Sequence, residues 1–363
     1  MTETTATDVS APTESSAPSV PYDAILVVSF GGPEGMDDVT PFLENVLRGR
    51  NVPRERMLAV AHHYELFGGV SPINQQNRDL IAALRRSLDA HGIDLPIYWG
   101  NRNWRPLLPD TLREMARDGR RHALAYITSA YSSYSGCRQY LEDIERAQRE
   151  VGPTAPQVSA LRKFYNHPDF IRANADRVRA ALATIPEPQR SEASLVFTAH
   201  SIPLSMAQNS HYVSQLREAG RLIAQELRLD GRWQVAYQSR SGAPSQPWLE
   251  PDICDTLRVL KDEGEAAVVV APIGFLSDHI EVLYDLDVEA RQLADELGLT
   301  MARAQTVGTH PAFVDMIRQL IVERIQPGTE RRFLGSDGAS PDTCGDDCCG
   351  GSAPARHETA QRE

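Results

Sequence analysis

Four acidic side chains recur at helical spacing in the segment "SDHIEVLYDLDVEA", which covers residues 277–290: Asp278, Glu281, Asp285 and Glu289. At about 100° per residue these positions fall within one narrow arc of a helix. Like charges at such spacings oppose each other by roughly 0.2–0.5 kcal/mol per pair, and no Lys or Arg within the stripe offsets them. The stripe therefore faces either water, with Asp278 and Glu281 as an ordinary capping box, or a cation or proton path.

A histidine stands at the end of another apolar strand. His200 closes "LVFTAH". A histidine in this position is more often a structural hydrogen-bonding residue than a catalyst, but its pKa near neutrality suits it to take protons at physiological pH. Paired across a cleft with Glu281, it would form half of an acid/base and metal-handling site.

Three cysteines crowd into a polar, Gly- and Asp-rich tail. The segment "TCGDDCC" contains Cys344, Cys348 and Cys349, where core packing cannot explain them. In a cytoplasmic protein such crowding indicates ligation of a metal or cluster. Three thiolates are one short of the usual four, and Cys137 in "SSYSGCRQY" could supply the fourth, whereas Cys254 is interpreted as a helix-core residue. The spacing leaves Zn²⁺ and a [2Fe–2S] cluster open.

Length and composition limit the class of protein. A chain of 363 residues with 41% hydrophobic content exceeds the usual single core, so two domains of roughly 150 residues each are expected. The net charge of −12 argues against nucleic acid or an anionic membrane surface as the main partner. No apolar run approaches the roughly 20 residues of a membrane span, and no signal-peptide core is present, so we expect a cytoplasmic protein without stable membrane insertion.

The elements that must position these residues follow from four apolar runs. These are "AILVVSFGGPEG", "ALAYITSAYSSYSGC", "SLVFTAHSIPLS" and "AAVVVAPIGFLSDH", with weaker strands at "IYWGNRNW" and "WQVAYQSRSG". Continuous apolar strands that alternate with amphipathic segments predict an α/β protein of two lobes, each a parallel sheet flanked by helices. Ligands of such sheets bind beyond the carboxyl ends of the strands, where His200 and the acidic stripe lie in the sequence.

The predicted organisation has five parts. Residues 1–20, rich in Ser, Thr, Ala and Pro, are expected to be a disordered tail. We expect an N-terminal lobe at 21–163, a C-terminal lobe at 164–309, a last helix at 310–327, and a polar tail with the clustered cysteines at 328–363. The Gly-rich loop "SFGGPEG" lacks both common nucleotide-binding fingerprints and is therefore a weak phosphate signal.

Several motifs together resemble those of the ferrochelatases, enzymes that insert Fe²⁺ into a porphyrin. They are "SFGGP", "GGVSPIN", "FTAHSIP", "YQSRSGAPSQPWLEP" and "PIGFLSDHIEVLYDLDVE", in this order. The resemblance runs from about Ile25 to the last helix, and implies two Rossmann-like lobes of the class II chelatase fold with a porphyrin cleft between them. It makes His200 and Glu281 the catalytic pair, with Asp285 and Glu289 continuing a metal or proton path. Which member of the pair takes the pyrrole protons stays open.

The resemblance also covers the tail. Animal and several actinobacterial members carry a [2Fe–2S] cluster held by one cysteine of the first lobe and three near the C-terminus, which implies Cys137, Cys344, Cys348 and Cys349 as ligands here. The animal enzymes space the last three differently. Two adjacent ligating cysteines are unusual, so the choice between Cys348 and Cys349 stays open if only one ligates.

The porphyrin-binding residues are expected in two groups. Phe30 stands where several Gram-positive relatives have a tyrosine near the iron, so any axial oxygen must come from elsewhere, and Tyr131 is expected to provide it. Trp248 and the loop around Tyr131 are expected walls of the cleft.

The second group lies in the polar stretch "AVAHHYELFGGVSPIN", where membrane-associated protoporphyrin enzymes carry an apolar lip. It supplies His62, His63 and Ser71, with Arg48 and Arg50 upstream, as groups that could contact additional carboxylates, although the two arginines could equally be surface charges. We therefore expect coproporphyrin III as the substrate.

Other functions remain as alternatives. One is a protoporphyrin IX ferrochelatase, and another is a chelatase for sirohydrochlorin or cobalt, although such relatives are typically shorter. A third is a non-catalytic haem or iron carrier. We expect porphyrin and Fe²⁺ as partners, a monomeric protein, and transient handover of product to the next haem-pathway enzyme.

Overall fold

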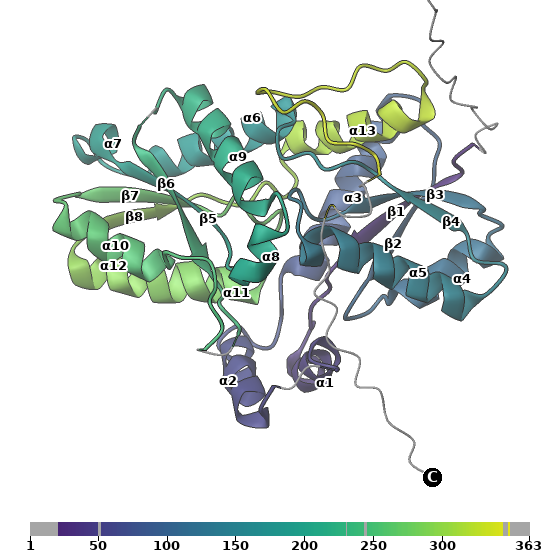
Figure 1. Cartoon of the computed structure of the whole chain (residues 1–363), viewed down its shortest axis with the longest axis horizontal. Helices are drawn as coiled ribbons and strands as arrows, with labels where there is room; N and C mark the ends of the chain where they lie inside the picture. The colour runs from purple at the N-terminus through teal and green to yellow at the C-terminus, as the bar shows by residue number, and fades with distance from the viewer. Residues whose placement is uncertain (1–20, 50–51, 230, 243–244, 344–347, 349–363) are drawn as a thin grey trace, which may run out of the picture.

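The computed structural model describes residues 21–49, 52–229, 231–242, 245–343 and 348. The predictions for residues 1–20, Arg50, Cys344 and Cys349 fall outside the described residues. The chain forms two α/β lobes that lie side by side (Figure 1). This arrangement confirms the predicted fold class of two parallel sheets flanked by helices.

The first lobe contains a parallel sheet in the order β2-β1-β3-β4. Its strands are β1 (Ala24–Ser29), β2 (Ile97–Asn101), β3 (His122–Ile127) and β4 (Gln157–Ala160). The helices of this half are α3 (Ile73–Ala90), α4 (Leu108–Arg117) and α5 (Gln139–Val151). Every residue of β1 is buried, as its continuous apolar run predicted. The edge strand β4 was missed because four residues of mixed polarity give no apolar run.

The second lobe repeats this topology in the order β6-β5-β7-β8. Its strands are β5 (Ser194–His200), β6 (Trp233–Gln238), β7 (Ala267–Ala271) and β8 (Thr300–Arg303). The helices between β4 and β8 are α6 (Pro168–Leu182), α7 (Gln189–Glu192), α8 (Leu204–Gln208), α9 (Tyr212–Leu227), α10 (Ile253–Asp262), α11 (Ile280–Val282) and α12 (Arg291–Leu297). In this sheet β6 lies on one side of β5 and β7 lies on the other, so the strand order reverses at β5. The crevice at this switch point is where open parallel sheets bind ligands.

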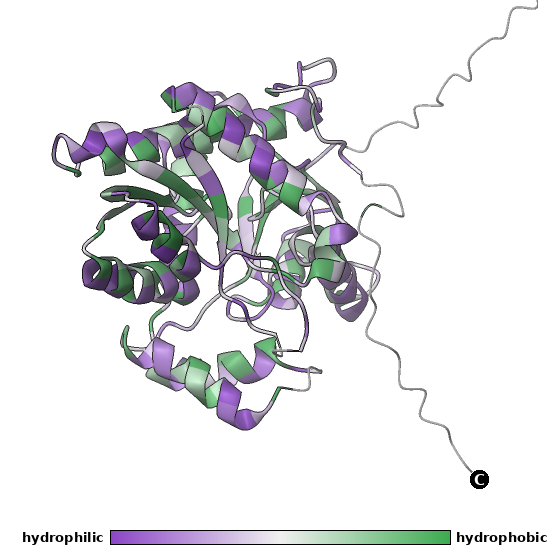
Figure 2. Cartoon of the chain, turned by 60° about the vertical axis from the view of Figure 1, so that its left-hand side comes forward, coloured by the Kyte–Doolittle hydropathy of each residue, from purple (hydrophilic) through white to green (hydrophobic). Residues whose placement is uncertain are grey.

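One apolar core runs through both lobes. It includes Val27 and Tyr126 from the first sheet and Phe197 and Val269 from the second. The last helix, α13 (Pro311–Ile325), packs against α3 of the first lobe and against α6. Figure 2 shows apolar residues along the strands and polar residues on the outer faces of the helices. The lobes are therefore held together by shared packing, and not by a linker alone.

Helices α1 (Met36–Val46) and α2 (Arg54–Glu65) project from the first lobe below the second, and we call this pair the lip (Figure 1). Its small core contains Phe42 and Tyr64 and also takes in Ile280 from the second lobe. Trp104 packs edge-on against Phe42, with ring centroids 6.1 Å apart. The lip thus contacts both lobes.

Residues 328–343, which belong to the predicted polar tail, pack on the protein surface. The backbone N–H of Leu334 donates to the carbonyl of Asn166 at 2.8 Å, and the Asn166 amide donates back to the Leu334 carbonyl. Arg332 pairs with the buried carboxylate of Asp169 at 2.8 Å. Buried polar groups of the segment before α6 and of its first turn need partners, and the tail supplies them.

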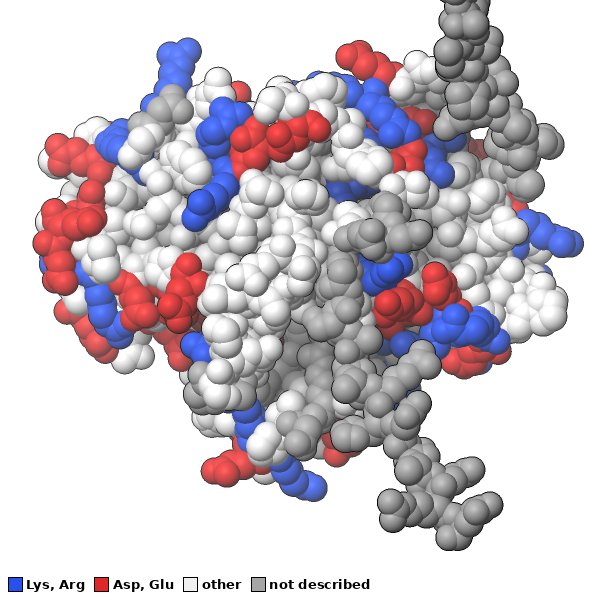
Figure 3. All heavy atoms as spheres, viewed as in Figure 1, with Lys and Arg blue, Asp and Glu red and all other residues white. Residues whose placement is uncertain are grey.

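Acidic and basic side chains are interspersed on the face seen in Figure 3. Within the described part of the chain, no helix is both long and apolar enough to cross a membrane.

Candidate active site

Three of the four acids of the stripe lie on a helix of three segments. The short α11 leads into a π-helix, η2 (Leu283–Ala290), which continues as α12. Glu281 belongs to α11, whereas Asp285 and Glu289 belong to η2, and we call these three the acidic track. π-Helical segments are rare and occur frequently at functional sites. Residue spacing cannot distinguish them from an α-helix, so the sequence predicted one regular helix.

His200 and Glu281 meet at the carboxyl ends of β5 and β7. Nε2 of His200 lies 3.6 Å from Oε2 of Glu281. Nδ1 of His200 lies 2.5 Å from the carbonyl oxygen of Ser201. Because a carbonyl oxygen only accepts hydrogen bonds, the proton of the neutral ring must be on Nδ1, which leaves the Nε2 lone pair facing Glu281. Both side chains remain accessible, with 33% and 44% of their surface exposed.

A glycine after β7 lets these two residues approach each other. The N–H of Gly274 donates to the carbonyl of Thr198 on β5 at 3.0 Å. A Cβ at Gly274 would lie only 2.5 Å from Cβ of Ala199, the residue before His200. A larger residue would push the β7 loop away from β5, and with it the helix that carries Glu281.

Two residues at the end of β6 hold the middle carboxylate of the track. Ser239 Oγ and Gln238 Nε2 both donate to Oδ2 of Asp285. Burial, followed by the charges of Glu281 and Glu289, raises the pKa of Asp285 to about 7 against these hydrogen bonds. Ser239 has a φ of 62°, a left-handed conformation that is strained for a non-glycine residue. Neither residue was predicted as part of the site, although Gln238 ends the strand "WQVAYQ", Ser239 follows it, and both lie in the quoted motif "YQSRSGAPSQPWLEP".

The outer end of the track is Glu289, which is exposed. Partial burial raises its pKa, while a hydrogen bond from Tyr284 opposes this shift. The track thus runs from the His200–Glu281 pair to the protein surface.

Asp278 does not belong to the track. Its Oδ1 accepts from Arg303 at 3.1 Å, and the same guanidinium binds Asp287 at 2.7 Å. The capping box of Asp278 and Glu281, considered as the alternative to a cation or proton path, is absent, because the helix starts after His279 and no side chain caps it. No Lys or Arg lies within the stripe, as the sequence shows, but Arg303 offsets the charge of Asp278 from β8, an edge strand that the sequence did not reveal.

Sequence reasoning also passed over His279. Its ring packs edge-on against Phe275, with centroids 5.1 Å apart. Burial is the main cause that lowers its pKa, and the charges of Glu281 and His200 act on it in opposite directions. The residue lies within "SDHIE" but off the acidic stripe, so periodicity alone did not mark it.

Tyr131 is not a wall of the cleft and does not offer an oxygen to iron. It is 2% exposed, and its hydroxyl donates to the carbonyl of Ile273 at 3.1 Å. Its ring packs edge-on against Tyr212, whose hydroxyl donates to the carbonyl of His200 at 3.0 Å. Tyr131 therefore connects the first lobe to the β7 loop behind the catalytic pair, a long-range contact that the sequence did not reveal.

The other predicted wall residues differ in exposure. Phe30 follows β1 and is 37% exposed, with the Arg102 guanidinium 5.8 Å from its ring centroid and the Phe42 ring packed edge-on at 6.3 Å. Trp248 is only 9% exposed, in a bridge with Pro203, so little of its indole is available to a ligand.

The predicted carboxylate contacts of the lip are also in different environments. Arg48 is exposed just after α1, and His62 pairs with Glu65 of its own helix at 2.9 Å. Ser71 is 3% exposed and packs so closely on Gly32 that a Cβ there would lie 2.7 Å away. The prediction that Ser71 is presented to substrate carboxylates is therefore wrong for this conformation. His63 stacks on Tyr284.

Of the predicted cluster ligands, Cys137 and Cys348 are described. Cys137 is buried in a second π-helical turn, η1 (Tyr134–Arg138), and Cys348 is partly exposed. Among the described residues, no three His, Cys, Asp or Glu side chains form a ready metal site. Cys254 packs in α10, and burial raises the pKa of its thiol to about 12, in keeping with a helix-core residue.

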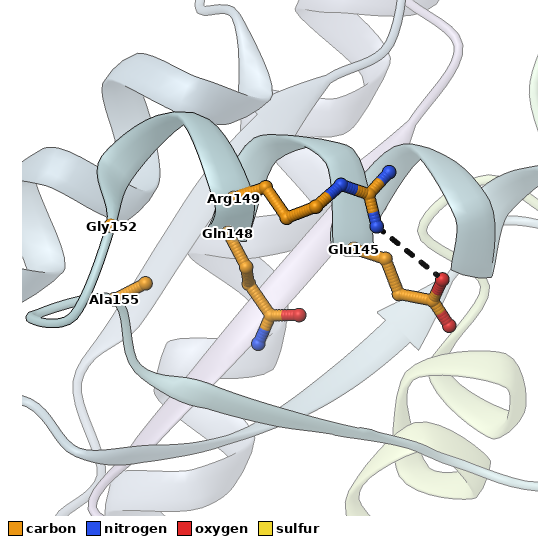
Figure 4. Close-up of a pocket in the computed structure, with 5 residues that line it drawn as sticks. All are labelled: Glu145, Gln148, Arg149, Gly152 and Ala155. Atoms are coloured by element: carbon orange, nitrogen blue, oxygen red, sulfur yellow. Dashed lines mark ion pairs between the residues drawn. The ribbon is translucent and has the colours of Figure 1, made fainter.

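A surface hollow on the first lobe is unrelated to this chemistry. It is lined by Glu145, Gln148, Arg149, Gly152 and Ala155 (Figure 4). These residues lie at the end of α5 and in the loop before β4, so the hollow is at the amino end of that strand. The catalytic pair is at the carboxyl ends of strands, where parallel sheets bind ligands.

Comparisons with known proteins identify the family of this chain. The ferrochelatase family profile matches residues 22–325. A ferrochelatase of Rhodopirellula baltica is 58% identical over 331 residues, which are 91% of this chain and 93% of that protein. A coproporphyrin III ferrochelatase of Streptomyces griseus is 52% identical over 355 residues, covering 92% and 95%. The solved structure of SirB from Bacillus subtilis with Fe³⁺ shares the fold, with a TM-score of 0.51 at 14% identity, over 85% of this chain and all of SirB. The chain belongs to the ferrochelatase family.

Proposed function

We propose that the protein inserts Fe²⁺ into coproporphyrin III. The observation that carries the chemistry is the His200–Glu281 pair, in which Nε2 faces a carboxylate 3.6 Å away and Nδ1 is occupied by a carbonyl. The choice of porphyrin is supported by relatives about 50% identical that are named coproporphyrin III ferrochelatases.

Metallation removes two protons from pyrrole nitrogens while a hydrated divalent ion loses its waters. The Nε2 lone pair of His200 can accept a pyrrole proton, and the nearby Glu281 carboxylate stabilises the resulting imidazolium. Asp285, with a pKa of about 7, can hold or release a proton near neutral pH. Glu289 at the surface completes a line of carboxylates along which protons can leave or the hydrated iron substrate can approach.

Coproporphyrin III carries two more carboxylates than protoporphyrin IX. Next to the lip, the exposed Arg48 can contact such a carboxylate, and the exposed Leu58 and Leu66 offer apolar surface to the macrocycle. Initial rates with both porphyrins at equal Fe²⁺ test the choice. A kcat/KM for coproporphyrin III at least about tenfold above that for protoporphyrin IX supports the proposal, and the reverse order contradicts it. Metal uptake that stops at one porphyrin per chain would indicate a carrier.

We further propose that Cys137, Cys344, Cys348 and Cys349 hold a [2Fe–2S] cluster. The cluster would anchor the tail to the first lobe. Two contacts support this assignment. Lys163 donates to the carbonyls of Ser129 at 2.9 Å and Gly136 at 2.7 Å, which fixes the turn that carries Cys137.

The second contact fixes the tail. Arg324 donates to the carbonyl of Ala160 at the end of β4 and pairs with Asp342 at 3.8 Å. Asp342 comes two residues before Cys344 in the sequence, so the tail is held against the first lobe just before its cysteines. The donor set of thiolates fits an iron–sulfur cluster.

A further inference from the structure

A stacked pair of rings joins the lip to the helix of the acidic track. His63 on α2 and Tyr284 on η2 have ring centroids 3.6 Å apart and planes inclined by 10°. Ile280, at the start of the same helix, lies in the apolar core of the lip. The lip therefore contacts the second lobe through an apolar residue and an aromatic pair that are one turn apart.

Tyr284 also belongs to the helix of the track. It directly precedes Asp285 on η2, the segment that carries Asp285 and Glu289. Burial and then the charge of Glu289 raise its pKa. One residue thus has its ring against the lip and its backbone in the helix that carries the track.

The position of His63 differs from that of a residue presented to a porphyrin carboxylate. Its ring lies flat on Tyr284, and burial lowers its pKa, so the imidazole carries little positive charge near neutral pH. Its neighbour His62 is exposed and bonds to Glu65 within α2. The two adjacent histidines therefore differ in their contacts: His63 stacks on a residue of the second lobe, whereas His62 bonds within α2.

We propose that His63 and Tyr284 are positioning residues, whose stacking holds the lip against the π-helix that carries Asp285 and Glu289. The porphyrin-binding lip and the iron path are then assembled by one contact. This inference deepens the proposed function and rests on it.

The proposal predicts a distinct pattern of kinetic constants. His63→Ala and Tyr284→Leu each remove the stack, so each raises KM for both porphyrin and Fe²⁺ by about three- to tenfold, the scale of an aromatic pair. The kcat at saturation stays within about twofold, because His200 and Glu281 are unchanged. The double variant has the same porphyrin KM as Tyr284→Leu alone, since the second change has no stack left to remove.

Conservative variants separate the two contacts. His63→Phe keeps a ring on Tyr284 and retains both KM values near those of the wild type. Tyr284→Phe keeps the ring on His63 and likewise retains both KM values near those of the wild type. Glu55→Gln changes an exposed residue in the first turn of α2 and is the control, which should change neither constant.

Two results would overturn the proposal. One is a porphyrin KM that rises as much in His63→Phe as in His63→Ala, because the imidazole would then act on the substrate itself. The other is a double variant whose effects multiply. A wild-type protein that metallates no porphyrin would instead refute the proposed function. Hydrogen exchange then still tests the stack: α2 exchanges faster in His63→Ala than in His63→Phe, and equal rates contradict it.

Discussion

Nε2 of His200 faces Oε2 of Glu281 across 3.6 Å, although the two residues follow different strands of the second sheet. The contact depends on the tight passage of Gly274 over Ala199 and on the bond from Tyr131 to the carbonyl of Ile273. The pair is therefore placed by the junction of both lobes and not by local sequence.

Loss of either member of this pair should abolish most of the catalysis while the fold persists. We expect His200→Ala and Glu281→Gln each to lower kcat by at least about 10²-fold, the scale of a lost general base. Initial rates of porphyrin metallation measure the change, and thermal unfolding checks the fold. His211→Ala, an exposed histidine before α9, is the control and should keep full activity. Turnover like that of the wild type in either variant would remove the pair from the mechanism.

The outer carboxylate should act on iron more than on porphyrin. Glu289→Gln removes a surface charge from the track, so we expect the KM for Fe²⁺ to rise about three- to tenfold, as for one lost charge interaction, with a smaller change for porphyrin. Glu296→Gln removes an exposed charge from the adjacent α12 and should change neither constant. Equal, small effects on both substrates would assign Glu289 to an ordinary solvated helix face.

The raised pKa of Asp285 should make stability depend on pH. Its folded pKa of about 7 exceeds the ordinary value of 3.8, so the folded state binds a proton more tightly than the unfolded chain. This contribution to stability is fully present below about pH 4 and is lost as the pH rises through about 7. The Asp285→Asn variant has no carboxyl to titrate at this position, so its stability does not fall in this way. The Tm of the variant minus the Tm of the wild type should therefore increase from pH 5 to pH 8. The exposed Asp255→Asn should show a constant difference. A constant difference for Asp285→Asn too would mean that its folded pKa is ordinary.

The parts that the sequence predicted are those with a local signal. The buried runs that became β1, β3, β5 and β7 are continuous and apolar, and residues at their carboxyl ends, such as His200, were found because parallel strands place their ends together. The burial of Tyr131 was not predictable, because it results from a contact with Ile273 in the other lobe.

The failures at the acidic stripe have the same cause. Arg303, the partner of Asp278, comes from an edge strand without an apolar run. The π-helical turn and the support of Asp285 by Ser239 depend on tertiary packing, since nothing in the spacing of acids every four residues distinguishes the two helix types. Long-range partners of polar groups therefore set the limit of the sequence prediction.

The cysteines give a prediction that is independent of activity. If Cys137 and the tail cysteines hold a [2Fe–2S] cluster, anaerobically purified protein should be reddish-brown with about two irons and two sulfides per chain. Cys137→Ser and Cys344→Ser should each abolish the colour, whereas Cys254→Ser, in α10, should retain it. Because the cluster binds the folded chain and ties the tail to the first lobe, its loss should also lower Tm. Colourless protein with one zinc per chain would contradict the cluster but keep the ligands. Colourless, metal-free protein after anaerobic handling would contradict both, and the contacts of Arg324 and Lys163 would then account for the ordered tail and turn by themselves.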